Sequence, residues 1–118
     1  MNAQLDPEIH TELELARQAR KSGNEGKARV CARRAAGMAL RKFFERSRIS
    51  AMGKSSYQLI QTFADLPGLD PRLRQSAINL SVKVNESFNL PEEVDLISEA
   101  NFLCEFLLNG WKYDQFIS

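Results

Sequence analysis

The chain has 118 residues, enough for one domain with a sizeable core. Its 16 basic and 15 acidic side chains nearly cancel, and 43% of its residues are hydrophobic. This composition excludes a disordered, collagen-like or disulfide-dense chain and argues against a protein that binds nucleic acid over its whole surface. No stretch approaches the roughly 20 apolar residues of a membrane span. We therefore expect a cytoplasmic protein with no secretory signal and no contact with a membrane.

The charge is distributed unevenly along the chain. Residues 1–15 hold four acidic side chains and no lysine or arginine, whereas residues 16–54 hold twelve basic and two acidic ones. The remaining residues, 55–118, carry four basic and nine acidic side chains. Overall neutrality therefore conceals a basic segment with a local charge of +10 between two acidic ends.

Two helices are expected in the first third of the chain. Asp6-Pro7 is typical of a helix start, because aspartate accepts from the first N–H groups and proline has no N–H to leave unpaired. Gly23 ends this helix, and Asn24 can cap a second one. Small residues dominate the apolar stripe of the second helix, which allows a neighbouring backbone to approach closely. That stripe consists of Ala28, Cys31, Ala32, Ala35, Met38 and Ala39.

A connection and two further helices follow. Residues 47–56 are expected to form a flexible connection, and a short third helix then runs to Leu66-Pro67-Gly68. Asp70-Pro71 repeats the capped start and predicts a fourth helix that ends at Asn89.

The fifth predicted helix is apolar over most of its circumference. It starts at residues 90–93 and stops at Gly110, and its character is typical of a helix at the centre of a bundle. The apolar residues recur at helical spacing along the whole chain. The sequence therefore predicts one all-α domain, an up-and-down bundle of five helices in residues 1–110, with an aromatic C-terminal tail in residues 111–118.

The two cysteines, Cys31 and Cys104, lie inside helical segments and outside any metal-ligand spacing. We interpret both as reduced core residues, with a disulfide between them as the alternative.

The layout of the chain resembles two known families. The run Ala19–Leu40, "ARKSGNEGKARVCARRAAGMAL", gives a helix, a short polar turn and a small-residue helix, and "NLPEEVDLISEANFLCEFL" restarts the last helix. This layout resembles the HEPN (higher eukaryote and prokaryote nucleotide-binding) helical bundles over most of residues 7–109. The resemblance implies a bundle that dimerises and works beside a small nucleotidyltransferase or as a metal-independent ribonuclease. Ribonuclease members carry an Arg-x4–6-His motif, but the single histidine here, His10, has no arginine before it.

The segment "GNEGKARVCARRAAGMAL" also looks like part of a tetratricopeptide hairpin. A repeat array would show the same pattern again about 34 residues later. No such repeat follows residue 48, so a single bundle is favoured.

The second predicted helix carries the main candidate binding surface, a basic face opposite the alanine stripe. Its side chains could bind phosphates of RNA, a nucleotide or an acidic protein surface. The alternative is a solvated face that pairs with acidic residues of the same chain. The candidate residues are Lys27, Arg29, Arg33, Arg34 and Arg41.

Arg20 lies on the apolar stripe of the first predicted helix. An arginine in that position either extends toward solvent or meets a carboxylate. We expect a structural ion pair, with Glu99 or Glu105 as the partner.

Two secondary apolar strips suggest self-association. They lie outside the main stripes of the fourth and fifth predicted helices, and the aromatic tail could cover one of them or reach across a two-fold axis. These observations favour a homodimer over a monomer. The candidate interface residues are Ile78, Val82, Phe102, Phe106, Trp111 and Tyr113.

The sequence contains no recognisable catalytic, metal or cofactor site. His10 could form a pair with Glu14 one turn later, but a metal ion needs three or four ligands, and "GNEGK" lacks the spacing of a phosphate-binding loop. We therefore expect a non-catalytic interaction module, dimeric or paired with a partner protein, that uses the basic face. Two alternatives stay open. One is a purely structural adaptor, and the other is an RNA- or nucleotide-processing protein whose unfamiliar active residues would come from Arg33, Arg34, Tyr57 and His10.

Overall fold

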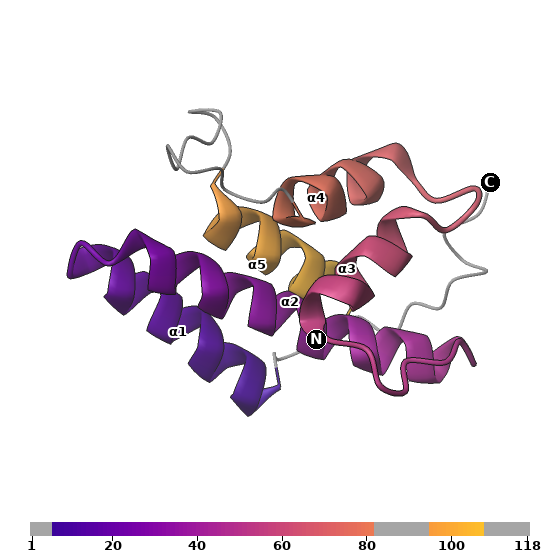
Figure 1. Cartoon of the computed structure of the whole chain (residues 1–118), viewed down its shortest axis with the longest axis horizontal. Helices are drawn as coiled ribbons and strands as arrows, with labels where there is room; N and C mark the ends of the chain where they lie inside the picture. The colour runs from indigo at the N-terminus through magenta and orange to yellow at the C-terminus, as the bar shows by residue number, and fades with distance from the viewer. Residues whose placement is uncertain (1–5, 82–94, 108–118) are drawn as a thin grey trace.

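The computed structural model describes residues 6–81 and 95–107, and these segments form a bundle of five α-helices without a strand (Figure 1). The all-α fold predicted from the periodicity is confirmed. The helices are α1 (Pro7–Lys21), α2 (Glu25–Arg46), α3 (Ser56–Ala64), α4 (Pro71–Ser81) and α5 (Leu96–Leu107).

The predicted starts of α1, α2 and α4 are confirmed by their caps. The Asp6 side chain accepts from the N–H of Glu8, and Asn24 Oδ1 accepts from the N–H of Lys27 at 3.1 Å. Asp70 caps α4 in the same way. The α3 helix starts with a capping box that the sequence analysis missed, formed by Ser55 and the residue three positions later.

The ends of α1 and α2 share one backbone pattern, a Schellman motif. After α1, the N–H of Asn24 donates to the carbonyl of Ala19, and Gly23 adopts a φ of 81°. After α2, the N–H of Ile49 donates to the carbonyl of Phe44, and Arg48 occupies the left-handed position with a φ of 59°. An arginine therefore sits where α1 has a glycine.

The core is built around α2, which packs against α1, α3 and α5. The alanines of α2 are fully buried, and both cysteines lie in the core without a disulfide, as predicted. Burial raises the pKa of the Cys104 thiol to about 12. The largest buried side chains include Phe43, Phe44, Phe63, Ile9, Leu13, Leu40 and Leu103.

Gly37 allows α3 to cross α2 at close range. A Cβ atom at this position would lie 2.3 Å from Ser56 Oγ and 2.8 Å from the Ser56 Cα atom. The close approach expected from the small-residue helix is therefore present, and it occurs on the side of α2 that the sequence analysis had assigned to solvent.

A carboxylate clamp joins α4 to α5. Glu99 accepts hydrogen bonds from Ser76 Oγ at 2.9 Å, from Asn79 Nδ2 at 2.6 Å and from Arg72 Nη1 at 3.1 Å. The guanidinium of Arg72 also lies 4.1 Å from the centre of the Phe102 ring. Because three residues of α4 converge on one of α5, these contacts fix the rotation of the two helices relative to each other.

Parts of the predicted organisation lie outside the described residues. The described α5 begins at Leu96 and is capped by Asp95, which is later than the predicted start at residues 90–93. The predicted continuation of the fourth helix to Asn89 and the tail in residues 111–118 are not described. Within 6–81 and 95–107, no helix is both long and apolar enough to cross a membrane.

Candidate functional site

The structure divides the predicted basic face between two sides of α2. Arg34 points toward α1, where its Nη1 atom lies 3.4 Å from Glu12 Oε1. Arg33, the preceding residue, points toward α4 and donates from Nε to the carbonyl of Leu80 at 2.7 Å. Consecutive helical positions are 100° apart, so these two guanidinium groups cannot serve one flat surface.

Arg41 has a structural role instead of facing solvent with the other candidates. It donates to the carbonyl of Ala51 at 3.1 Å and to that of Lys54 at 2.7 Å, and so ties the connection after α2 to the helix. Expecting Arg41 to face outward was wrong, because α3 and this connection cover the second half of α2. Arg41 instead lines a surface hollow of about 580 Å³ together with Glu45, Arg48, Ile49, Ser50, Ala51 and Met52.

Arg29 and Arg33 lie one helical turn apart, on the side of α2 away from Arg34. Burial and then the charge of Arg29 lower the pKa of Arg33. Arg29 Nε is buried and has no hydrogen-bond partner among the described residues, and its charge acts on Glu25. Arg29 therefore belongs to a charged network at the start of α2 that includes Glu25, whereas Arg33 is held toward α4 by its bond to Leu80.

Arg20 belongs to the same network, and its predicted partners were wrong. Its Nε and Nη2 atoms donate to Glu25, and Nη1 donates to Asp95 at 2.9 Å, so neither Glu99 nor Glu105 is involved. The hydrogen bond from Arg20 is the main cause of the lowered pKa of Glu25. The expectation of a structural ion pair is confirmed with different carboxylates, because the α1–α2 turn brings Glu25 next to Arg20.

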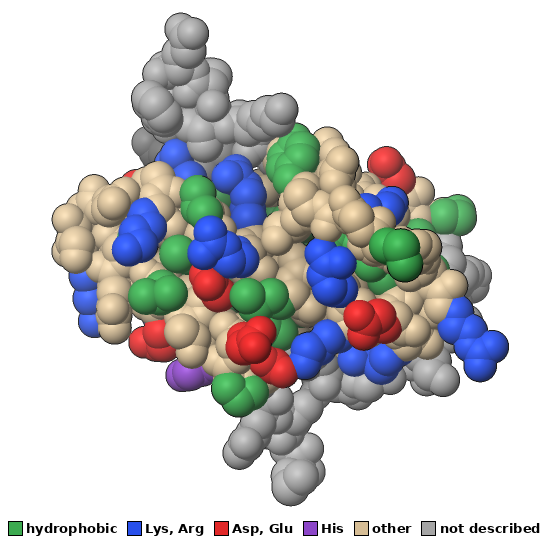
Figure 2. All heavy atoms as spheres, turned by 60° about the horizontal axis from the view of Figure 1, so that its bottom comes forward, with side chains coloured by type: hydrophobic (Ala, Val, Ile, Leu, Met, Phe, Trp, Pro, Cys, Tyr) green, Lys and Arg blue, Asp and Glu red, His purple; other side chains and the backbone are tan. Residues whose placement is uncertain are grey.

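What stays exposed is a short strip on the first half of α2, which we call the basic strip: Lys27, Val30 and Arg34. Their spacing of three and four residues places them on one face. Val30 is 49% exposed, and the Arg34 side chain is 52% exposed. Figure 2 shows one face of the molecule on which blue basic side chains are interspersed with green and red ones. The basic strip therefore combines a solvent-exposed apolar side chain with a cation on either side.

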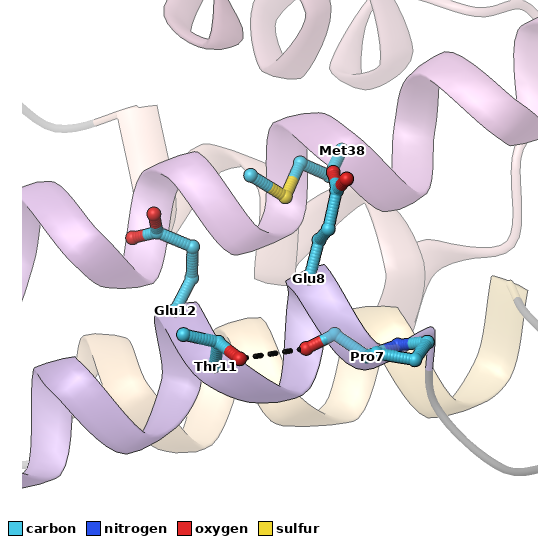
Figure 3. A pocket seen from close by; sticks show the side chains of 5 residues that line it. All are labelled: Pro7, Glu8, Thr11, Glu12 and Met38. Carbon is cyan, nitrogen blue, oxygen red and sulfur yellow. Dashed lines mark hydrogen bonds between the residues drawn. The ribbon is translucent and has the colours of Figure 1, made fainter.

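A groove that the sequence analysis missed lies next to this strip, between α1 and α2. We call it the acidic groove; it has a volume of about 400 Å³, and Pro7, Glu8, Thr11, Glu12 and Met38 line it (Figure 3). The Thr11 hydroxyl donates to the carbonyl of Pro7 at 2.9 Å, so it is already engaged. The Glu12 side chain is only 13% exposed. The four-residue spacing of the two glutamates was the available signal, but their partner across the groove, Met38, comes from a distant part of the sequence.

The predicted apolar interface is only partly described. Ile78 is 41% exposed, and Phe102 and Phe106 are partly buried with ring centres 5.9 Å apart. Ser76 faces α5. Ile78 is two residues later and lies about 200° around α4 from Ser76, so it points away from both rings. Three further candidates, Val82, Trp111 and Tyr113, lie outside the described residues.

The alternative set of active residues is not assembled at one place. An electrostatic interaction with Tyr57 raises the pKa of Arg33, against the larger effects of burial and of Arg29. Arg34 faces α1 instead, and His10 is exposed on α1 without a side-chain hydrogen bond or ion pair in the described part of the chain. No group of three or more histidine, cysteine, aspartate or glutamate side chains suited to a metal ion occurs within residues 6–81 and 95–107.

Comparisons of the chain with protein-family models, with curated proteins and with solved structures find no match.

Proposed function

We propose that the chain is a non-catalytic interaction module that binds an acidic surface of a partner protein through the basic strip. The observation that carries this proposal is the exposure of Val30 between two cations on a regular helix. Protein interfaces combine an apolar anchor with charged groups that orient the partner and exclude others. Lys27 and Arg34 are the charged groups in this arrangement.

The hydrogen bonds of the other candidate arginines also favour the basic strip as the binding surface. Arg33 and Arg41 each donate to backbone carbonyls, so less of their hydrogen-bonding capacity is available to a ligand. An RNA-binding surface would need several cations along one groove with aromatic side chains between them. The basic strip offers two cations and an aliphatic side chain, which suits a protein partner better.

The relation to HEPN bundles is part of the same proposal. It is supported by the α1–α2 hairpin with its short polar turn, by the small residues of α2 and by the short α3 that follows. The absence of an arginine before His10 in the sequence supports a binding role within such a family. The two unbridged cysteines support a reducing, cytoplasmic setting.

Site-specific photo-cross-linking in the native host tests this proposal. A benzophenone amino acid at Val30 should form an adduct with a partner protein that carries carboxylates next to the cross-linked position. Adding Lys27→Glu and Arg34→Glu should reduce the yield at least tenfold, because both charges that orient the partner are reversed.

The matched control carries the same photo-reactive group at Met52, which is 89% exposed and lies away from the basic strip. An adduct at Val30 that the control does not form supports the proposal. Equal yields at the two sites, an adduct insensitive to charge reversal, or an adduct with RNA would each contradict it.

A further inference from the structure

We propose that the partner is a second copy of this chain, docked by two-fold symmetry so that Lys27 of each copy enters the acidic groove of the other. This inference rests on the proposed function and names the acidic surface that the basic strip binds. It concerns the α1–α2 face, which differs from the apolar surfaces that the sequence suggested for a dimer.

Two opposite charges on this face have no ion-pair partner in the part of the chain that the structure describes. Glu8 and Lys27 are both exposed, and neither side chain makes an ion pair with any residue in 6–81 or 95–107. They lie on adjacent antiparallel helices joined by a tight turn, so their separation is fixed by the hairpin. A second copy brings each of these charges to the opposite charge of the other.

The acidic groove has the chemistry to receive a lysine side chain. Figure 3 shows Glu8 and Glu12 extending from α1 toward α2 on either side of Met38. The Pro7 ring and the Met38 side chain offer apolar contact for the methylene stem, while the carboxylates accept from the ammonium group. Among residues 6–81 and 95–107, the one cation that pairs with Glu12 is Arg34, at the long distance of 3.4 Å.

The spacing along α2 is compatible with two-fold symmetry. Lys27, Val30, Arg34 and Met38 follow one another at three- and four-residue intervals on a single face, and Met38 marks the groove about 16 Å along the axis from Lys27. A two-fold axis that is perpendicular to α2 and lies midway between these positions places Lys27 of each copy in the acidic groove of the other. Val30 of each copy then packs on the aliphatic stem of the partner's Arg34, which explains the exposure of an apolar side chain there.

A charge exchange between the two unpaired residues tests this arrangement by sedimentation equilibrium. The wild-type chain should form a dimer that dissociates on dilution and weakens with added salt. Lys27→Glu and Glu8→Lys should each raise the dimer dissociation constant at least tenfold, because each places two like-charge pairs in the symmetric interface.

Mixing the two single variants gives the decisive result. In a one-to-one mixed dimer, the glutamate at 27 meets the lysine at 8, and the unaltered lysine meets the unaltered glutamate. The mixture should therefore recover dimers with an affinity within a few-fold of the wild-type value. Because recovery requires folded chains, it cannot come from misfolded variants, and thermal unfolding of each variant provides an independent check.

Three results would overturn the inference: a monomeric wild-type chain at all concentrations, a dimer that neither variant weakens, or a mixture that stays monomeric. If the chain is monomeric while cross-linking at Val30 captures a different acidic protein, the proposed function holds and the second copy is the wrong partner. If cross-linking at Val30 also fails, both conclusions fall.

Discussion

At the scale of single residues, Gly37 shows how one missing side chain sets the position of a whole helix. Glycine inside a helix costs about 1 kcal/mol relative to alanine. The structure accounts for this cost, because the Ser56 backbone occupies the space that a Cβ atom would need.

Alanine at position 37 should therefore destabilise the protein, despite its better helix propensity. We expect Gly37→Ala to lower the free energy of unfolding by about 1–3 kcal/mol, the usual cost of overpacking. Gly26→Ala is the matched control, because the nearest atom to its Cβ would be Asn24 Oδ1 at 3.9 Å. That variant should gain up to about 1 kcal/mol. Denaturant unfolding measures both, and equal effects at the two positions would refute this account of Gly37.

At position 48 the chain has an arginine where the backbone conformation favours glycine. Its φ of 59° costs a non-glycine residue roughly 1 kcal/mol, and the equivalent position after α1 is Gly23. We expect Arg48→Gly to stabilise the chain by about 0.5–1 kcal/mol and Gly23→Ala to destabilise it by about 1 kcal/mol. Thermal unfolding of both variants checks the pair, and a loss of stability in Arg48→Gly would show that the arginine side chain makes a contribution larger than its backbone cost.

The roles of the arginines were the least predictable feature at this scale. Their number and local charge are evident in the sequence, but Arg33, Arg41 and Arg74 each donate to a backbone carbonyl in another part of the chain. Such contacts depend on where loops and helix ends lie in space, which no spacing along the chain encodes. The sequence therefore indicated a basic surface larger than the one that is exposed.

At the scale of elements, the carboxylate of Glu99 joins α5 to α4, because three side chains of α4 donate hydrogen bonds to it. Burial opposes ionisation of Glu99, but the hydrogen bonds from Asn79, Ser76 and Arg72 outweigh it, so the pKa of Glu99 lies below its ordinary value. A folded-state pKa below the unfolded value adds stability above about pH 4.3, and this stability is lost as the pH falls through the folded-state pKa.

Glu99→Gln should therefore remove part of the acid sensitivity of folding. We expect a loss of about 1–3 kcal/mol at neutral pH, because the donors around position 99 lose an acceptor. The difference from the wild type should shrink as the pH falls below about 4. Glu105→Gln, an exposed change on the same helix, should stay within about 0.5 kcal/mol. Urea unfolding across the acid range measures this, and parallel pH profiles for Glu99→Gln and the wild type would contradict the clamp.

The stabilities of alanine variants at Arg41 and Lys27 should distinguish a cation with a structural role from one with a binding role. Arg41→Ala removes the donor to two loop carbonyls and should cost about 1–3 kcal/mol of unfolding free energy. Lys27→Ala should change it by less than about 0.5 kcal/mol, because its exposed ammonium has no partner among the described residues. Equal stability losses in the two variants would mean that Lys27 has a structural role instead.

The helices themselves were well predicted, because their signals are local. Aspartate–proline and asparagine caps gave the starts of α1, α2 and α4, and the apolar spacing gave the buried faces. The crossing of α3 over α2 was not predicted, since it depends on Gly37 and Ser56 meeting in space. That crossing, with the connection before α3, is why Arg41 does not face solvent with the other candidates.

At the scale of the whole molecule, the near-zero net charge results from opposite charges, some of which pair within the chain while others stay apart. Part of the basic segment is neutralised internally, by Glu12, Glu25 and Asp95 among others. Glu8 and Lys27 on the α1–α2 face pair with none of the described residues, and we have assigned that face to a second copy. A surface that is neutral overall but divided locally favours one orientation of its partner over others.

The most direct test of the α1–α2 face as the docking surface is a dilution series followed by two-dimensional ¹H–¹⁵N NMR. We expect concentration-dependent shifts at Glu8, Lys27, Val30 and Arg34, with little change at Ile78. A spectrum that is the same at all concentrations, or shifts confined to Ile78 and Phe102, would contradict the account.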